Sequence, residues 1–477
     1  MFNLARTFIL SSPLLVVFAS AVLVMLFDLF NPKSRWTIYF SYLGLLVAIG
    51  LCANLFPGDS TIIWPTLFIS DNWGHLLQMF IAISAGLSIF YSSSKLSSLE
   101  SAKGDILSLY LLSTVGMMLL VISQSMMSLY LSLELTSLPL YALVASQKNN
   151  QNAIEAGVKF FIMGAIASVF ILFGMSILYG LSGQVQFDKV AHGLMSHMQE
   201  DKLMILLGII FIIAGASFKV ALVPFHMWVP DVYVGAHPVI TLFLSAAPKI
   251  AGLGIFLRLS MSGLFDVIPM THHVLALLAL SSVALGNFAA LVQIDLRRLL
   301  AYSTISHMGY AILGFVAGGK VGQSASILYV IIYSLMTVIA FATVILPNAN
   351  GKMLLMVNDL KGLNKRSPWM AAMLMIVFFS MAGVPPALGF FAKLFIIRAL
   401  VDAGLYYVAI IALILAVVGA FYYLNLIRIM YFEAPEASMH PIEVQPIKKT
   451  IYALQSLSLL LFGIFPNALI AMCMQSF

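Results

Sequence analysis

The sequence predicts an all-α polytopic membrane protein of about fourteen transmembrane helices. Of its 477 residues, 62% are hydrophobic and only 9% are charged, and the mean hydropathy is +1.04. Soluble proteins carry about a quarter charged residues, so this composition excludes a soluble fold. Apolar runs of about twenty residues, each long enough to cross a bilayer as a helix, follow one another along the whole chain.

Turn-forming residues such as Asn31-Pro32 and Pro347-Asn348 separate these apolar runs. The first run follows Arg6 as the core of a signal peptide would, but its length and the many later runs favour a retained helix. The expected spans are 8–30, 36–56, 73–92, 106–123, 126–146, 153–182, 203–231, 238–260, 272–294, 299–318, 323–346, 369–401, 403–430 and 450–473.

Two of the expected spans contain proline in their interiors. Span 203–231 contains Pro224 and Pro230, and span 369–401 contains Pro385-Pro386. A helix in lipid must satisfy its backbone groups internally, so such breaks are tolerated where the segment is buried in protein or lines a wet cavity. We therefore expect both broken helices to line an ion or proton path.

The spacing of the two broken helices predicts an internal repeat, because paired interrupted segments are typical of inverted-repeat transporters. Each repeat would contain five helices, an odd number, so the two repeats would run in opposite directions across the membrane. The expected divisions are three N-terminal helices in 1–105, a first inverted repeat in 106–262, a second in 263–430, and a cytoplasmic loop with helix fourteen in 431–477.

The distribution of Lys and Arg predicts the orientation in the membrane. Loops after odd-numbered spans hold fourteen of these 24 residues, Lys448 among them, and the opposite side holds six, including Arg258. The positive-inside rule then places the odd loops in the cytoplasm and both termini on the periplasmic side. The net charge of +6 comes from these short loops and does not indicate nucleic-acid binding.

Four lysines remain inside the predicted spans, namely Lys159, Lys219, Lys249 and Lys393. A charge at the bilayer centre costs roughly 2.5–3.5 kcal/mol on insertion scales, so a buried lysine indicates a functional site. Lys219 and Lys249 are central, whereas Lys159 is close enough to a span end to extend to the interface. Glu134 is the only carboxylate near the middle of a span. It is expected to be a charge partner or proton carrier, or else a protonated, hydrogen-bonded group.

Two histidines are further candidates. His307 belongs to a polar stretch with Ser303 and Thr304, and is either a relay on a hydrated line or a hydrogen-bonded packing residue. His226 lies just past the first break, as a relay or as a cap for freed carbonyls. Because a nearby carboxylate stabilises a charged lysine, moving that carboxylate would switch the lysine's charge state, which provides a mechanism for pumping.

The sequence contains no motif for a redox group, a nucleotide or a metal. Cys52 and Cys473 are isolated thiols, whereas an iron–sulfur cluster or a structural zinc usually takes about four ligands. There is no Walker loop and no GxGxxG after a strand, so we expect no cofactor in this chain. A metal site is also disfavoured at the loop histidines, which lack carboxylate or thiol companions at ligand spacing: His192, His197, His272 and His273.

Four stretches resemble the antiporter-like membrane subunits of respiratory complex I, the proton-translocating NADH:quinone oxidoreductase. They are VPFHMWVPDVY (223–233), LSAAPKIAG (244–252), LLAYSTISHMGYAILG (299–314) and GVPPALGFFAKLF (383–395). The first two have the form found in the bacterial subunit N branch. The match extends from about residue 100 to 430. One departure is Val234, since the family commonly has Glu in a YEGAP sequence there, which puts in doubt a role for a loop carboxylate.

The resemblance implies a subunit of a translocase in the bacterial inner membrane, with no redox centre of its own. In this family a Glu and a Lys on the fifth and seventh helices form a pair. The lysine on the eighth helix relays toward the one on the twelfth, and a histidine lines the route. The matching residues are Glu134, Lys219, Lys249, Lys393 and His307, with Lys159 beside them.

The resemblance also implies the partners of the chain. These are other complex I membrane subunits, both antiporter-like and small ones. NADH, FMN, iron–sulfur clusters and quinone would be bound by partner subunits. Two alternative functions fit the same residues. One is a subunit of a multi-subunit cation/proton antiporter, which shares the fold and the buried lysines. The other is a structural membrane scaffold, in which the charges only set helix packing and lysine-to-methionine changes are tolerated.

Overall fold

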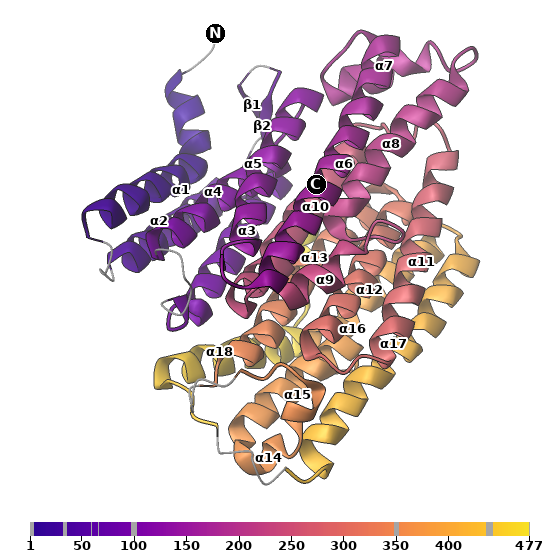
Figure 1. Ribbon diagram of the computed structural model, residues 1–477. Coiled ribbons are helices and arrows are strands. Elements are labelled where there is room, and N and C mark those ends of the chain that lie inside the picture. Colours follow the sequence, from indigo (N-terminus) through magenta and orange to yellow (C-terminus); the bar gives the residue numbers. More distant parts are fainter. Residues whose placement is uncertain are drawn as a thin grey trace.

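Long helices lie side by side in the computed structural model, with one small β-hairpin near one end of the bundle (Figure 1). The structure describes residues 4–31, 36–58, 60–64, 66–96, 103–347, 353–435 and 442–476. Thirteen of the described helices are long and apolar enough to span a membrane. The remaining predicted span contains two shorter helices, α15 (Pro368–Ala382) and α16 (Leu388–Asp402). The predicted fold class is confirmed.

The N-terminal part consists of α1 (Leu4–Phe30), α2 (Trp36–Leu55) and α3 (Asn72–Ser92), and α1 and α2 lie at one edge of the bundle (Figure 1). Between α2 and α3 the chain forms an antiparallel hairpin of β1 (Thr61–Trp64) and β2 (Phe68–Ser70), which the sequence analysis does not predict. The amide of Ile69 donates to the carbonyl of Ile122, so the hairpin covers one end of α4 (Lys103–Val121).

The following helices surround α10 (Pro238–Met261), whose side chains are almost all buried. The helix α4 packs on α5 (Met126–Val144), and α6 (Gln151–Ser182) packs on α8 (Lys202–Val220). Between α6 and α8 lies the short helix α7 (Phe187–Met195), in a segment where no helix is predicted. Asn150 caps the start of α6 and Gly183 ends it in the left-handed conformation, in agreement with the expected breaks there.

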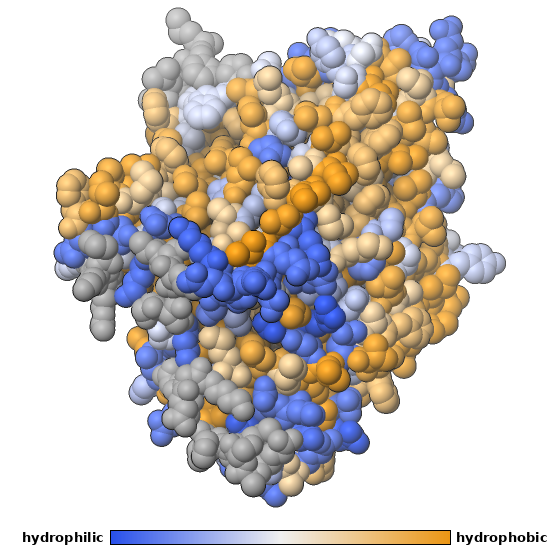
Figure 2. All heavy atoms as spheres, in the orientation of Figure 1, coloured by the Kyte–Doolittle hydropathy of each residue, from blue (hydrophilic) through white to orange (hydrophobic). Residues whose placement is uncertain are grey.

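The second half of the chain is built around α12 (Leu296–Ala317) and α13 (Gly319–Ile345), which are also almost fully buried. The outer helices are α11 (Met270–Leu291) and α17 (Tyr406–Phe432), and α18 (Pro446–Ile464) and α19 (Asn467–Gln475) end the chain. Two one-turn elements, η3 (Val357–Leu360) and α14 (Leu363–Arg366), precede α15. Figure 2 shows hydrophobic side chains over much of the visible surface, with hydrophilic ones gathered across its middle.

Both predicted breaks are present, and they have the same local form. The helix α8 ends at Val220, and α15 ends at Ala382. The next residue is left-handed in each case, with φ of 72° at Ala221 and 83° at Gly383. A proline follows three residues later. The helix resumes as α9 (Trp228–Gly235) after the first break and as α16 after the second. The inverted-repeat relation between the two halves stays a prediction.

Two of the cations assigned above to loops are buried inside helices, so a loop position is wrong for them. Arg258 is on α10, is 8% exposed, and donates to both carboxylate oxygens of Asp71 at 2.6 and 3.1 Å. Lys448 is in the first turn of α18, is 5% exposed, and donates to the carbonyl of Tyr91 at 2.7 Å, near the end of α3. Both residues are predicted to lie in loops because their partners come from distant segments, which the local sequence cannot reveal.

Candidate functional site

Lys219 lies in the last turn of α8, just before the first break. Its ammonium group donates to the hydroxyl groups of Ser137 at 2.8 Å and Tyr141 at 3.4 Å, both on α5. A cavity of about 30 Å³ lies beside it. A cavity of this size has room for about one water molecule, and Thr136, Ser137 and Lys219 are the polar residues in its mostly apolar wall. The side chain therefore meets polar groups at the middle of an apolar bundle.

Glu134 is half-buried on α5, and its Oε1 accepts a hydrogen bond of 2.5 Å from Ser168 of α6. Residues three apart on a helix share a face, so Glu134 lies on the same side of α5 as Ser137, which receives Lys219. In the part of the chain that the structure describes, no direct ion pair joins Glu134 to Lys219. The pair implied by the resemblance is thus separated by hydroxyl groups in this conformation.

Lys249 is fully buried near the middle of α10, with 0% of its surface exposed. Its Nζ lies 3.4 Å from the backbone oxygen of Lys219 and 4.7 Å from the centroid of the Trp228 ring. The carbonyls in the last turn of a helix have no partner within that helix, so the break makes one available to the ammonium group. The aromatic face adds a cation–π contact.

His226 lies in the segment between α8 and α9 and is 8% exposed. Its ring atom Nδ1 has no hydrogen-bond partner among the described residues. Its backbone oxygen accepts from the amide of Val229, which starts the turn into α9. The structure thus places His226 in the first break, but its hydrogen bonds do not link it to the lysines.

Lys393 repeats this arrangement at the second break. It lies on α16, is 8% exposed, and donates to the carbonyls of Ala382 at 2.7 Å and Met381 at 3.2 Å, at the end of α15. The ring of Tyr310 lies 5.5 Å from its Nζ. At both breaks, therefore, carbonyls freed by the end of one helix receive a lysine from another helix.

His307 occupies the region between the two breaks, on α12. Its Nδ1 and Nε2 lie 2.8 Å and 3.1 Å from the hydroxyl groups of Tyr329 and Tyr423, and the residue is 3% exposed. The hydroxyl of Tyr423 also contacts Ser303. This buried tyrosine cluster is missing from the sequence-based candidates because tyrosines in apolar runs look like ordinary core residues.

A third tyrosine extends the polar cluster toward Lys249. The hydroxyl of Tyr333 on α13 lies 2.8 Å from Thr304 and 3.1 Å from the carbonyl of Ser245, which is one turn before Lys249 on α10. Its ring centroid is 5.4 Å from that of His307. Polar side chains thus lie between Lys249 and His307, although no continuous hydrogen-bond chain joins them in the described residues.

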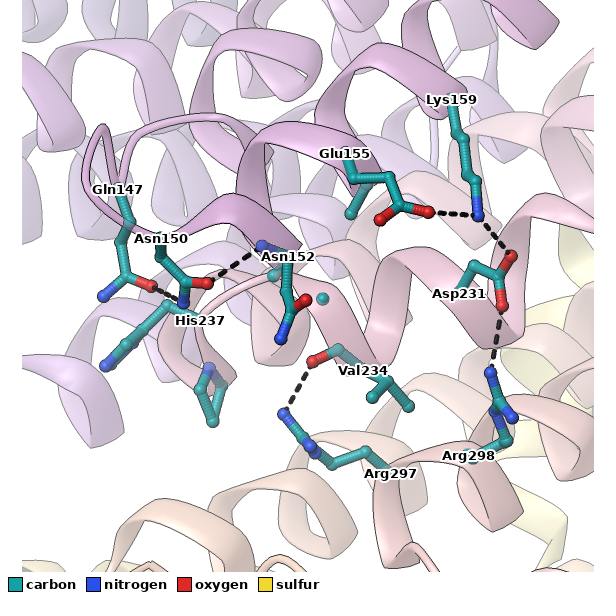
Figure 3. Close-up of a pocket in the computed structure, with 14 residues that line it drawn as sticks. Gln147, Asn150, Asn152, Glu155, Lys159, Asp231, Val234, His237, Arg297 and Arg298 are labelled. Carbon is teal, nitrogen blue, oxygen red and sulfur yellow. Dashed lines mark hydrogen bonds and ion pairs between the residues drawn. The ribbon is translucent and has the colours of Figure 1, made fainter.

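Lys159 lies at a pocket of about 600 Å³, the vestibule, at the end of the bundle where α6 begins (Figure 3). Its side chain is 45% exposed and forms ion pairs with Glu155 at 2.7 Å and Asp231 at 3.2 Å. Asp231 also pairs with Arg298 of α12 at 3.0 Å. Lys159 is therefore not buried and does not pair with Glu134. Its acidic partners lie on one face of α6 and on α9, and no role for them follows from the sequence alone.

Val234 and His237 line the same vestibule. Arg297 donates to the backbone oxygen of Val234 at 2.8 Å and pairs with Asp295 at 2.9 Å, so a backbone carbonyl and a nearby aspartate satisfy this cation (Figure 3). His237 caps α10 by accepting from the amide of Val239 at 3.3 Å. Burial, together with the nearby Arg297 and Lys95, lowers the pKa of His237 to about 4, which keeps this ring a neutral acceptor.

The remaining histidines show no metal-binding arrangement in the described residues, where no three His, Cys, Asp or Glu side chains come together. His272 contacts Asp266 at 2.9 Å, and His197 contacts Asp201 at 3.5 Å, as simple pairs. Across both halves, Lys219, Lys249 and Lys393 are held by hydroxyl, carbonyl and aromatic groups. Lys159, by contrast, forms ion pairs with carboxylates, and it lies at the vestibule.

The chain is similar to known membrane proteins over nearly its whole length. Residues 123–419 match the model of a family described as NADH:quinone oxidoreductase/Mrp antiporter, TM. The NADH-quinone oxidoreductase subunit N of Nitrosomonas europaea is 42% identical over 95% of this chain and 94% of its own length. The protein of the same name from Coxiella burnetii is 37% identical over 98% of both chains.

Solved structures give the same result for the fold. A chain of respiratory complex I from Thermus thermophilus with bound Aureothin superposes with a TM-score of 0.82 at 27% identity, covering 96% of this chain and 98% of that chain. A chain of the Mrp complex from Dietzia sp. DQ12-45-1b gives 0.81 at 19% identity, covering 99% and 96%. At that lower identity the likeness shows the fold alone.

Proposed function

This chain belongs to the NADH:quinone oxidoreductase/Mrp antiporter membrane family and, within it, to the subunit N group, and on that premise we propose that it translocates protons through its buried lysines. It would do so as an antiporter-like subunit of a proton-translocating NADH:quinone oxidoreductase. Electron transfer in partner subunits would drive the movement. This chain would hold no redox group, and NADH, FMN, iron–sulfur clusters and quinone would be bound by its partners.

One observation carries the proposal: three lysines lie inside the apolar helix bundle, held by neutral groups. Lys249 and Lys393 are 0% and 8% exposed, and both donate to carbonyls at helix breaks. A buried cation is expensive unless it is well compensated. Carbonyls and hydroxyl groups can accept from an ammonium group and can equally border a neutral amine. A lysine in such surroundings can therefore take up and release a proton without leaving an unpaired carboxylate.

We infer the following order for the proton path. Glu134 and Lys219 form its first part on α5 and α8, and Lys249 follows, since its ammonium group contacts the backbone oxygen of Lys219. The polar cluster around His307 leads on to Lys393 at the second break. Lys159 would act at the vestibule, where its ion pairs place it, and His226 would act within the first break.

The same proposal includes the arrangement of the chain in the membrane. The vestibule side would face the cytoplasm of a bacterial cell, as the excess of Lys and Arg on that side favours, and both termini would lie on the periplasmic side. The two halves would be inverted repeats, each with one broken helix. The partners would be other membrane subunits of the complex, antiporter-like and small. A cation/proton antiporter is less well supported, because the relatives covering nearly the full chain are named NADH-quinone oxidoreductase subunit N.

The test compares buried with exposed lysines in the assembled complex. Lys219→Met and Lys249→Met should lower the number of protons translocated per NADH oxidised by membrane vesicles, while Lys189→Met, at an exposed position on α7, should leave it unchanged. Glu134→Ala should act like the buried-lysine variants.

Full proton translocation in both buried-lysine variants, with normal amounts of assembled complex, would favour the structural scaffold instead. Cation-driven proton exchange in the absence of NADH, lost in the same variants, would favour the antiporter.

A further inference from the structure

Two cavities of this chain lie one after the other along α6 and α9. The lining of the vestibule includes Ala156, Lys159 and Asp231. Figure 3 shows Lys159 and Asp231 at its wall. The small cavity beside Lys219 is lined by Phe160 and Trp228. Along α6 and α9 the vestibule is lined by residues up to Lys159 and from Asp231 onward, and the small cavity begins at Phe160 and Trp228, so the two rings lie at the end of the small cavity nearest the vestibule.

The two rings fill the space between α6 and α9 closely. Their centroids are 4.5 Å apart with an angle of 16° between the planes, and Phe160 and Trp228 are 5% and 3% exposed. The ring of Phe218 stacks beside them, 5.3 Å from that of Trp228. The indole nitrogen of Trp228 donates to the carbonyl of Phe218 at 3.0 Å. The only polar atom of the pair is thus already bonded, and nothing in the stack can bind water.

We propose that Phe160 and Trp228 form an aromatic gate between the vestibule and Lys219. The gate rests on the proposed function and deepens it, because it gives the residues that control when protons reach the path. A proton moves between side chains along hydrogen-bonded groups or water, and an apolar constriction that excludes water blocks it. When the rings are stacked, no water connects Lys219 to the vestibule. When the rings move apart, water connects Lys219 to the vestibule.

The structure also supplies the element that would move the gate. The helix α9 has eight residues and follows the non-helical break at 221–227. Asp231 holds it to Lys159 of α6 and to Arg298 of α12, while Trp228 lies over the ammonium group of Lys249. Loss of either ion pair frees α9 on the vestibule side, and a change in the charge of Lys249 changes the attraction for the Trp228 ring on the other side.

Phe160 is the better position for testing the gate, because Trp228 also lies against the ammonium group of Lys249. Phe160→Leu removes the ring and keeps an apolar side chain, whereas Trp228→Phe keeps a ring in the stack and is the matched control. The reporter is Leu140→Cys, at the wall of the small cavity. The reference is Asn152→Cys, at the wall of the vestibule. Cys52 and Cys473, each 1% exposed, are replaced by alanine in every variant.

The measurement is the rate at which silver ions, which are about the size of water, react with each cysteine in the assembled complex in inside-out membrane vesicles. In the chain with both rings, Leu140→Cys should react more slowly than Asn152→Cys. Phe160→Leu should raise the Leu140→Cys rate about three- to tenfold, the effect of losing one aromatic contact on an open–closed equilibrium. It should leave the Asn152→Cys rate unchanged. Trp228→Phe, which keeps a ring in the stack but loses the hydrogen bond to Phe218, should raise the Leu140→Cys rate less than Phe160→Leu does.

Equal rates at the two cysteines in the intact gate would overturn the proposal, even if Phe160→Leu fails to assemble. So would an unchanged Leu140→Cys rate in an assembled Phe160→Leu complex. Lys219→Met separates this outcome from the proposed function. If Lys219→Met loses proton translocation while Phe160→Leu leaves the rate of silver reaction at Leu140→Cys unchanged, the gate is wrong and the proposed proton path stands. If it keeps full translocation, the proposed function itself is wrong.

Discussion

Gly383→Ala tests whether the position of Lys393 at the second break matters for proton translocation. Gly383 has φ of 83°, and an added Cβ would lie 2.9 Å from Cδ and 3.3 Å from Nζ of Lys393. The left-handed backbone costs an alanine roughly 1–2 kcal/mol. The displaced lysine also weakens its hydrogen bonds to Ala382 and Met381, and one hydrogen bond to a charged group contributes about 1.5–3 kcal/mol. The two effects add to about 2.5–5 kcal/mol.

Gly404→Ala is the matched control, because Gly404 has φ of 75° and an added Cβ there meets nothing within 4 Å. It carries the backbone cost without touching a lysine. The assay is the number of protons translocated per NADH oxidised by the purified complex in proteoliposomes, together with its thermal unfolding. We expect both variants to lower the melting temperature and Gly383→Ala alone to lower the proton yield. An equal yield in the two variants would show that the position of Lys393 is not critical.

Three further outcomes are expected from other parts of the chain. Arg258→Met leaves Asp71 buried without its cation, which costs roughly 3–5 kcal/mol and should lower the melting temperature, and adding Asp71→Asn should restore most of the loss. Because the pKa of His237 falls from its ordinary value near 6.5 to about 4, the unfolded chain binds this proton more readily, so stability should fall as the pH drops from about 6.5 to about 4. His237→Asn, which keeps a capping group, should remove that part of the pH dependence of thermal unfolding. Ser168→Ala removes the donor to Glu134 and should lower proton translocation in vesicles, whereas Ser168→Thr, which keeps the hydroxyl, should not.

The buried lysines illustrate what could be predicted from sequence. Lys219, Lys249 and Lys393 stand in long apolar runs, far from the run ends or next to prolines. The structure buries Lys249 and Lys393, and it half-buries Lys219 beside a small cavity. Lys159 has a similar local context, but it lies near the start of α6 at the vestibule and pairs with Asp231, 72 residues away. Distance from a span end distinguishes buried lysines from an exposed one such as Lys159 only in part, because a lysine side chain can extend over more than one helical turn.

The aromatic and hydroxyl partners are the part that sequence reasoning missed. Tyr329 and Tyr423 contact His307 from helices far apart in the chain, and Ser168 reaches Glu134 from the next helix. A tyrosine or serine in an apolar run reads as packing, since its function depends on which side chain it faces. Arg258 and Asp71 are 187 residues apart, and nothing local to either residue indicates their pair.

The sequence by itself determined which segments are apolar enough to cross the membrane, where two of them break, and that Lys219, Lys249 and Lys393 lie within them. These features depend on the local run of apolar side chains and on the missing backbone donor of proline, both of which act over one or two helical turns. Only the tertiary structure decided which groups receive each lysine, where the vestibule ends, and which aromatic rings close it. Those contacts arise when helices distant in the chain pack together, because a side chain's partners are set by the face that the neighbouring helix presents and not by its own sequence.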